Sequence, residues 1–365
     1  MKQTLVIICM LLLSFVPIWC VRECVDMDDD HKFERVEMRR VRIVAAGDLM
    51  QHRPQMVAAQ LRDTTKYDFT PSFTLVADRF KDADISIINL ETTLSEDGPY
   101  TGYPCFCAPE ELADAMADMG IDVAAMANNH CCDKGVKGIK STLDILDKRD
   151  ISLVGVYRDS VDYKNNNILY LKRRGMCFAI LNYTYGTNGI NVPKGMYVNL
   201  IDTVAMARDL EQVKAQKVDC VIAVMHWGNE YERNANASQI KIEKFLRRHG
   251  VNIIFGSHPH VVQPYREYAN GVTLYSMGNF VSNQRTRYRD GGIIATVDVV
   301  GVERWRGDSL LKKDVYYELS LMPVWVMLPK YVVVPADMGE QLDMNYDSRF
   351  RYNRFMNDLR EHIDV

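Results

Sequence analysis

The sequence has no excess of basic residues, since its 365 residues include 44 lysines and arginines against 48 aspartates and glutamates. The resulting net charge of −4 argues against broad nucleic-acid binding, which requires a basic face. Glycine (21 residues) and proline (12 residues) are too few for a collagen-like or low-complexity chain. Because 47% of the residues are hydrophobic, the chain can also bury enough apolar surface to exclude disorder as its dominant state.

Long apolar runs are also scarce, which excludes a polytopic membrane protein. One uncharged run covers residues 3–21 and predicts an export segment over residues 1–21, either a signal peptide or a membrane anchor. Cys20 stands where a lipoprotein signal has its cysteine, although Trp19 is bulkier than such signals prefer. Cleavage, lipidation and an uncleaved anchor therefore stay open. We expect residues 22–40 to be a charged spacer and the protein to reside in the cell envelope.

The nine cysteines do not have zinc-finger spacing. Export implies an oxidising compartment, in which disulfides are allowed. Cys105 and Cys107 could pair with Cys131 and Cys132, or all four could be free or buried thiols.

Apolar runs rich in β-branched residues predict strands that are buried on both faces. These runs cover residues 41–46, 85–90, 123–127, 151–156, 177–181, 218–225, 251–255 and 272–277. Helical patterns alternate with them over residues 109–120, 135–149, 202–216 and 238–248. This alternation predicts an α/β fold with a layered sheet in one domain, residues 41–300. For the C-terminal extension, residues 301–365, we expect strands broken by prolines over 316–334 and a closing helix over 348–362.

Polar residues follow several of these strands, at the sheet edge where α/β proteins bind ligands. Five of the eight histidines lie there, with one aspartate, one glutamate and one asparagine. The set is Asp48, His52, Glu91, Asn129, His130, His226, His258 and His260. Such mixed nitrogen and oxygen donors suit Mn, Zn or Fe, and their number exceeds one tetrahedral site. We therefore predict two divalent ions, with Mn favoured and Glu91 as the bridging carboxylate.

Six motifs occur in a fixed order over about residues 43–280. They are AAGDLMQH, NLETTLS, ANNHCCDKG, HWGNEY, GSHPHVVQP and YSMGNF. Together they resemble the CapA (PgsA) family, which is associated with poly-γ-glutamate capsule synthesis and related to calcineurin-like metallophosphatases. The resemblance implies a four-layer α/β/β/α sandwich of the metallo-dependent phosphatase type.

The resemblance also implies roles for individual residues. It assigns Asp48 and His260 to the first ion, Asn129, His226 and His258 to the second, and Glu91 to both. His130, next to Asn129, would face the substrate as a general acid or transition-state donor. Met50 replaces the histidine of the family's Asp-x-His pattern. Either His52 substitutes for it, or the first site is weak or fills only with substrate present.

Other residues are candidates for supporting roles. Asp133 and Glu230 could accept hydrogen bonds from the ligating histidines. Arg53, Arg285, Arg287 and Arg289 could clamp an anionic substrate, or the last three could belong to a solvated loop. Tyr100, Tyr103 and Tyr231 could line a cleft or be ordinary core and surface residues.

Two functions fit these observations. The first is a metal-dependent hydrolase that uses a metal-bound hydroxide against an amide of an anionic polymer or against a phosphoester. The alternative is a non-catalytic, membrane-tethered component that binds or exports the polymer. Either would work beside membrane proteins of capsule synthesis and without nucleic acid.

Overall fold

The computed structural model describes residues 33–62 and 65–364. The expected export segment, with Cys9 and Cys20, and also Cys24, lie outside these residues. The described chain divides into two compact units. The smaller unit comprises residues 33–37 and 302–314, and the larger unit comprises residues 38–301 and 315–364.

The smaller unit is built from strand ends and one tight turn. Gly307 has a φ of +55° at this turn, and its N–H donates to the Glu34 carboxylate at 2.8 Å. The Glu34 N–H donates to the Trp305 carbonyl at 2.9 Å. Regular strand begins at Arg35, so residues 35–40 of the expected spacer are strand. The strands that enter this unit are β1 (Arg35–Leu49), β16 (Gly291–Arg306) and β17 (Ser309–Met327).

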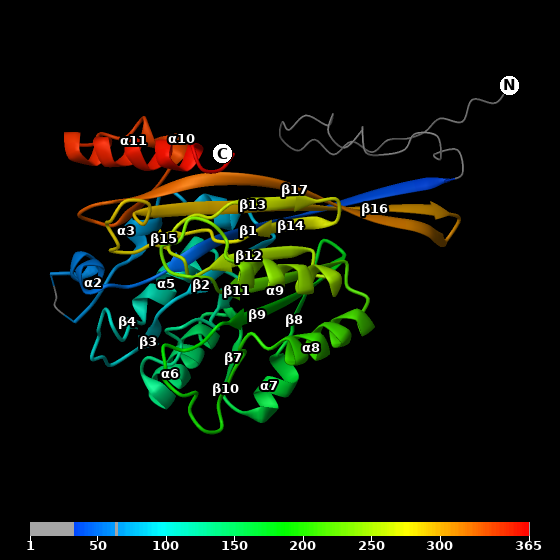
Figure 1. The fold of residues 1–365 in the computed structure, drawn as a ribbon, viewed down its shortest axis with the longest axis horizontal. Helices are drawn as coiled ribbons and strands as arrows, with labels where there is room; N and C mark the ends of the chain where they lie inside the picture. Colours follow the sequence, from blue (N-terminus) through cyan, green and yellow to red (C-terminus); the bar gives the residue numbers. More distant parts are fainter. Residues whose placement is uncertain (1–32, 63–64, 365) are drawn as a thin grey trace. The chain divides into compact units, whose positions relative to one another are not determined.

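Two large sheets form the larger unit (Figure 1). The first has the order β18-β17-β16-β1-β2-β5-β6, with β15 beside β1, and β1, β2, β5 and β6 pair in parallel. Its further strands are β2 (Ile85–Leu90), β5 (Val123–Ala125), β6 (Ser152–Val154), β15 (Asn279–Val281) and β18 (Val332–Pro335). The second has the order β13-β14-β12-β11-β9-β8. Its strands are β8 (Leu169–Arg173), β9 (Met176–Thr184), β11 (Cys220–His226), β12 (Ile253–Ser257), β13 (Tyr265–Tyr268) and β14 (Gly271–Leu274).

Short pairs complete the strands. They are β3 (Thr93–Ser95) with β4 (Cys107–Pro109), and β7 (Val156–Tyr157) with β10 (Tyr197–Val198). The short or peripheral helices are α2 (Arg53–Ala59), α3 (Thr70–Phe73), α4 (Ala77–Lys81), α7 (Ser160–Asn166) and α10 (Ala336–Gly339).

Alternation along the strands sorts side chains into separate cores. In β1, Ile43 and Ala45 join apolar residues of the second sheet, whereas Val44 and Ala46 point to the opposite face. That opposite face is covered by α5 (Glu111–Met119) and α6 (Gly135–Asp147). The outer face of the second sheet is covered by α8 (Thr203–Ala215) and α9 (Ala237–Arg248). The four-layer α/β/β/α sandwich is therefore confirmed.

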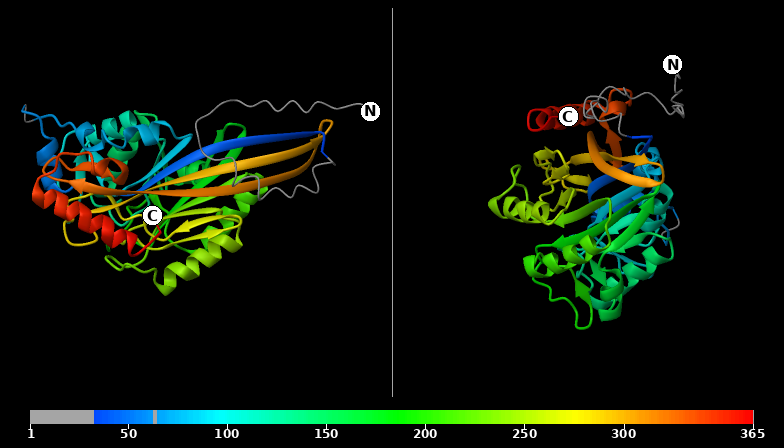
Figure 2. Two further views of the ribbon diagram at one scale, coloured as in Figure 1. Left: turned by 90° about the horizontal axis from the view of Figure 1, so that it is seen from above. Right: turned by 90° about the vertical axis from the view of Figure 1, so that its right-hand side faces the viewer.

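The closing helix is confirmed as α11 (Tyr346–Arg360). Figure 2 shows this helix, in red, beside the orange strand β17. The rings of Tyr352 in α11 and Trp325 in β17 lie 6.0 Å apart in an edge-to-face contact. The expectation that prolines break the strands was wrong for Pro323, because β17 continues through it to Met327.

The remaining predictions for the described residues follow the same pattern. Each apolar run contains a strand, although the run at 151–156 is divided between β6 and β7. The six described cysteines are free thiols, which answers the question left open for Cys105, Cys107, Cys131 and Cys132. Within residues 33–62 and 65–364, none of the helices combines the length and apolar character that a membrane crossing requires.

Candidate metal centre

Parallel pairing brings polar residues together at one edge of the first sheet. In register, Asp48 of β1 lies beside Asn89 of β2 and beside Asn279 of β15. Gly47 permits this close approach, because a Cβ atom there would lie 2.0 Å from the Gly278 carbonyl oxygen. The Asp48 N–H donates to that same carbonyl at 3.0 Å.

The second sheet delivers three histidines to the same place. His226 ends β11, and the chain leaving β12 turns through His258 and His260. These last two have φ values of +97° and +57°, a region in which residues other than glycine are strained. The His258 N–H approaches Asp48 Oδ1 at 3.4 Å, and Asn279 Nδ2 donates to the His260 carbonyl at 3.3 Å. The surrounding contacts thus hold a strained turn that aims two imidazoles inward.

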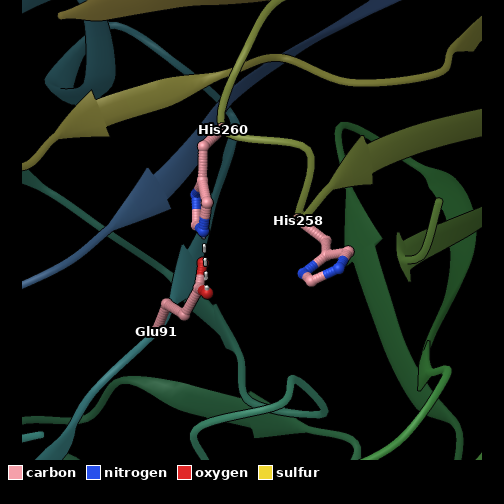
Figure 3. A group of neighbouring side chains, drawn as sticks. All are labelled: Glu91, His258 and His260. Atoms are coloured by element: carbon pink, nitrogen blue, oxygen red, sulfur yellow. Dashed lines mark ion pairs between the residues drawn. The ribbon is translucent and has the colours of Figure 1, made fainter. Parts of the chain in front are cut away.

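Two groups of side chains have ligand atoms close enough to share an ion. Glu91, His258 and His260 form one group, and Asp48, Glu91 and His226 form the other, with all ligand atoms of a group within 4.8 Å of one another. Figure 3 shows His260 directed at the Glu91 carboxylate, with the His258 ring beside them. Glu91 belongs to both groups, which fits the bridging role predicted for it. The residues in each group differ from the ligands predicted for each of the two ions. The assignment of ligands to the two ions therefore stays a prediction.

Individual distances show how tightly these groups are assembled. His260 Nδ1 lies 2.9 Å from Asp48 Oδ2, and its Nε2 lies 3.8 Å from Glu91 Oε1. His226 Nε2 lies 3.7 Å from the same Glu91 oxygen and 2.8 Å from Asn129 Oδ1. The structure therefore brings the predicted ligand Asn129 to the others through His226.

Two buried polar atoms of the two ligand groups have no hydrogen-bond partner among the described residues. They are Glu91 Oε1 and His258 Nδ1. Leaving a buried polar atom unsatisfied costs about 1–3 kcal/mol, so folded proteins rarely do it without a reason. Carboxylate, imidazole and amide oxygen are suitable ligands for a divalent ion. The residues present therefore fit a metal ion.

The two carboxylates have opposite pKa shifts. Burial raises the pKa of Glu91 well above its usual value, and the nearby charge of Asp48 raises it further. Burial would also raise the pKa of Asp48, but hydrogen bonds from His260 and from Asn89 Nδ2 (2.8 Å) outweigh it and hold this pKa below its usual value. Burial thus favours the neutral form of Glu91, while the contacts of Asp48 favour its charged form, and a cation beside Glu91 would favour ionisation of this carboxylate.

Burial favours the neutral form of two of the ligand histidines, His226 and His258. Burial lowers the pKa of His226 well below its usual value and that of His258 to about 4, and charge on the neighbouring histidines adds to both effects. Neutral imidazole is the form that coordinates metal ions.

His130 lies beside the ligands and is held by Asp133. Its Nδ1 lies 2.7 Å from Asp133 Oδ2, which also accepts the Phe106 N–H at 2.6 Å. The Phe106 ring contacts the His130 ring edge-on at 4.6 Å. Asp133 is thus an acceptor for a histidine, as predicted, but for His130 and not for a ligand. Glu230 is exposed and interacts with Tyr231.

His52 lies near these residues but in neither ligand group. Its Nδ1 lies 3.2 Å from Gln55 Oε1 and accepts the Asn283 N–H at 3.3 Å. Burial lowers the pKa of His52 to about 4, and its ring contacts Phe106 at 5.0 Å. Met50 stands where the family pattern has a histidine ligand, and the replacement of that ligand by His52 stays a prediction.

The predicted substrate clamp at Arg285 and Arg287 stays a prediction, and the structure shows a partner for Arg287 within the fold. Its guanidinium forms two hydrogen bonds, of 2.9 and 2.6 Å, with the carboxylate of Asp358 in α11. Arg285 is largely buried, with its guanidinium 5.6 Å from the Trp325 ring centre and 4.0 Å from Asp290. Both guanidiniums therefore serve contacts within the fold.

Arg289 and Arg53 remain available. The Arg289 guanidinium carbon lies 3.3 Å from the centre of the Tyr231 ring, and that ring lies 6.1 Å from His260. This arrangement places a positive charge near the ligand groups. Arg53 is exposed in the first turn of α2.

Three residues at the site were not assigned from the sequence. Asn89 Nδ2 lies 2.8 Å from Asp48 Oδ1, 3.2 Å from Glu91 Oε2 and 3.4 Å from His226 Nδ1, so one amide links both sheets. Asn279 Oδ1 lies 3.2 Å from His260 Nδ1. Both asparagines stand in the motifs at strand ends, which is the signal that identified the ligands.

Tyr185 is the third of these residues. It directly follows β9, and its ring lies 4.5 Å from His258 and 6.3 Å from His226. The ring is 47% exposed, so it covers the ligands on the solvent side. Its position just after a predicted strand was the available signal.

Solved structures align with this chain at low TM-scores. A novel phosphatase from Mycoplasma pneumoniae aligns with a TM-score of 0.44 at 12% identity, over 78% of this chain and 95% of that chain. The calcineurin-like phosphoesterase YfkN from Bacillus subtilis aligns with a TM-score of 0.42 at 12% identity, over 89% of this chain and 98% of that chain.

Sequence comparisons are more specific. The capsule biosynthesis protein CapA of Bacillus anthracis is 32% identical over 237 residues, which cover 58% of this chain and 56% of that protein. The PGA biosynthesis protein CapA of Bacillus subtilis is 33% identical over 187 residues, 51% of this chain and 49% of that protein. The chain thus spans about half the length of the curated relatives it matches. The family described as bacterial capsule synthesis protein PGA_cap matches residues 42–284. These residues include every ligand described above, and the chain belongs to this family.

Proposed function

We propose that this protein is a metal-dependent hydrolase of capsule polymer synthesis, which acts on an amide of a poly-γ-glutamate type chain or on a phosphoester. The observation that carries the proposal is the pair of buried ligand groups that share Glu91. The unpartnered Glu91 Oε1 and His258 Nδ1 support a bound cation there. The names of the relatives, capsule and PGA biosynthesis proteins, support the polymer context.

The chain's own residues divide the work. Asp48, Glu91, His226, His258 and His260 would hold two divalent ions, with Mn favoured over Zn or Fe. Such ions supply Lewis acidity and activate water. The buried position of these residues excludes bulk water and strengthens their electrostatic effect.

His130 would hold or donate a proton on the substrate side. Asp133 Oδ2 accepts from its Nδ1 at 2.7 Å, which fixes the ring and leaves Nε2 as the atom that would face the leaving group. Asn129 would act beside it as a ligand, because its Oδ1 lies 2.8 Å from His226 Nε2. Arg289 would attract the negative charge of the substrate.

We further propose that the protein is exported and works in the cell envelope, with residues 1–21 as signal peptide or anchor. The uncharged run at residues 3–21 supports this placement. Membrane proteins of capsule synthesis would then be its neighbours.

Elemental analysis of the purified full chain tests the metal site. We expect bound divalent metal in the unmodified protein and its loss in the variant His226→Ala/His258→Ala. The matched control is His249→Ala, because His249 is exposed at the end of α9 and caps that helix. Equal metal content in the double variant and the control would refute the site.

The second candidate function is polymer binding or export without catalysis, and Met50 at a position where the family pattern has histidine favours it. Turnover distinguishes the two functions. With excess Mn²⁺, we expect hydrolysis of poly-γ-glutamate or of a phosphodiester, and its loss in His130→Ala. Tight polymer binding with no turnover, unchanged by His130→Ala, would establish the binding role instead.

A further inference from the structure

A hollow of about 400 Å³ lies beside the metal centre, and neither ligand group includes a residue that lines it. Its wall combines the start of α2, the loop that precedes β4, and the residue before α6. The lining residues are His52, Arg53, Pro54, Tyr100, Thr101, Gly102, Tyr103, Pro104, Cys105 and Lys134. Among these described residues two are basic and none is acidic.

The positive charge continues beyond this hollow. Lys134 also lines a second hollow of about 160 Å³, together with Lys137 and Ser95. Lys134 and Lys137 stand at the start of α6, whose first turn contains no acidic residue. The helix dipole adds partial positive charge at the same end. Arg53, Lys134 and Lys137 thus lie along two hollows that share Lys134.

Contacts between side-chain rings connect the larger hollow with the metal centre. The buried Phe106 ring contacts His52 at 5.0 Å on the side of the hollow and His130 at 4.6 Å on the side of the metal centre. The backbone makes the same connection, because Asp133 accepts the Phe106 N–H and also holds His130. Tyr103, which is 76% exposed, lies 6.4 Å from Phe106.

Close packing fixes the wall of this hollow. A Cβ atom on Gly102 would lie 2.6 Å from the backbone nitrogen of Arg53, so the loop lies directly against the start of α2. Thr101 and Cys107 exchange backbone hydrogen bonds of 2.9 and 2.8 Å. These contacts hold the loop that forms the wall against the start of α2 and against β4.

We propose that the hollow lined by Arg53 and Lys134 binds successive carboxylates of an extended acidic polymer whose neighbouring unit occupies the metal centre. The volume is too large for a single inorganic anion and suits several units of a flexible chain. Separate single cations match carboxylates that are spaced along a chain, and Tyr103 offers an apolar surface to the methylene groups between them. The identity of the polymer rests on the proposed function.

Binding of fluorescently labelled poly-γ-glutamate to the full chain tests this inference. Fluorescence anisotropy is measured in EDTA, so that metal ligation contributes nothing. We expect Arg53→Gln/Lys134→Gln to weaken binding about tenfold at low ionic strength and to make its salt dependence shallower. The control is Lys140→Gln, which removes one charge from the exposed face of the same helix and lines neither hollow. This control should bind as the unmodified protein does.

Three results would overturn the inference: unchanged affinity in the double variant, an equal loss in Lys140→Gln, or polyphosphate binding more tightly than poly-γ-glutamate. Metal content, measured on the same samples before EDTA is added, keeps the two proposals apart. A chain without metal that still binds the polymer through Arg53 and Lys134 refutes the metal site but not the hollow. A double variant that has full metal content and unchanged polymer affinity refutes the hollow but not the metal site.

Discussion

Replacing Glu91 by glutamine should stabilise the metal-free protein while abolishing its stabilisation by metal. Glu91 is fully buried beside Asp48, and its Oε1 has no hydrogen-bond partner in the described part of the chain. Burial raises the pKa of Glu91 in the folded state above its ordinary value of 4.5. Above pH 4.5 this carboxyl therefore ionises first in the unfolded state, and the free energy of unfolding falls as the pH rises. A glutamine of nearly the same shape does not ionise, and its amide could donate toward His226 or His260.

The size of the effect follows from the unsatisfied oxygen. Such an atom costs about 1–3 kcal/mol, and each unit of pKa shift adds about 1.4 kcal/mol. At roughly 2 °C per kcal/mol for a chain of this size, metal-free Glu91→Gln should melt at least 2–6 °C above the metal-free unmodified protein at pH 7. The further difference that the pKa shift adds should disappear as the pH approaches 4.5, which leaves the 2–6 °C that come from the unsatisfied oxygen.

Bound metal is expected to stabilise the unmodified protein and not Glu91→Gln. At one hundred times its dissociation constant, a bound ion stabilises the folded state by about 2.7 kcal/mol, or roughly 5 °C here. Differential scanning fluorimetry with EDTA or Mn²⁺ should therefore show a metal-dependent rise in Tm for the unmodified chain and none for Glu91→Gln. A metal-free variant that melts below the unmodified protein at pH 7, or one that still responds to Mn²⁺, would refute the reasoning.

Three further expectations concern other parts of the molecule. In metal-free Glu91→Gln, the free energy of unfolding should fall as the pH drops from 6.5 toward about 4, by up to about 3 kcal/mol from His258 alone. The cause is the lowered pKa of His258 in the folded state, because of which the unfolded state binds the proton first. A free energy of unfolding by urea that does not change over this pH range would contradict this expectation. Asp133→Asn should lower turnover by roughly 10–100-fold at unchanged metal content, since His130 loses its acceptor, and a loss of metal instead would show that Asp133 supports the ligands. Leu246→Ala, which opens a cavity between α9 and the second sheet, should cost about 2–5 kcal/mol in denaturant unfolding without changing metal content.

Much of this fold was readable from the sequence because parallel strands buried on both faces leave continuous apolar runs. The pattern around Ile43, Val44 and Ala45 carries no alternation, since one face meets the second sheet and the other meets helices. Helix ends were equally visible where glycine takes the left-handed conformation, as at Gly120 after α5. Pro323 predicts a break in the strand because a proline lacks a backbone N–H donor, yet β17 continues through it.

The ligands were also readable, because strand ends in a parallel sheet meet at one edge. Asp48 and Glu91 come at the ends of neighbouring strands of the first sheet, so their proximity follows from the topology, whereas His226 ends a strand of the second sheet and reaches them through the packing of the two sheets. The roles of the arginines were not readable. Arg287 is held by Asp358, which lies 71 residues away in α11, and no local pattern encodes that pairing.

Asn89 shows most clearly what spacing alone could not supply. Its amide reaches Asp48 on one strand and His226 on the other sheet, so it joins the two halves of the centre before any metal arrives. Distances across the stacked sheets depend on the packing of the core between them, and the sequence does not state that packing. One neutral amide therefore links the carboxylates of Asp48 and Glu91 in the first sheet with the imidazole of His226 in the second.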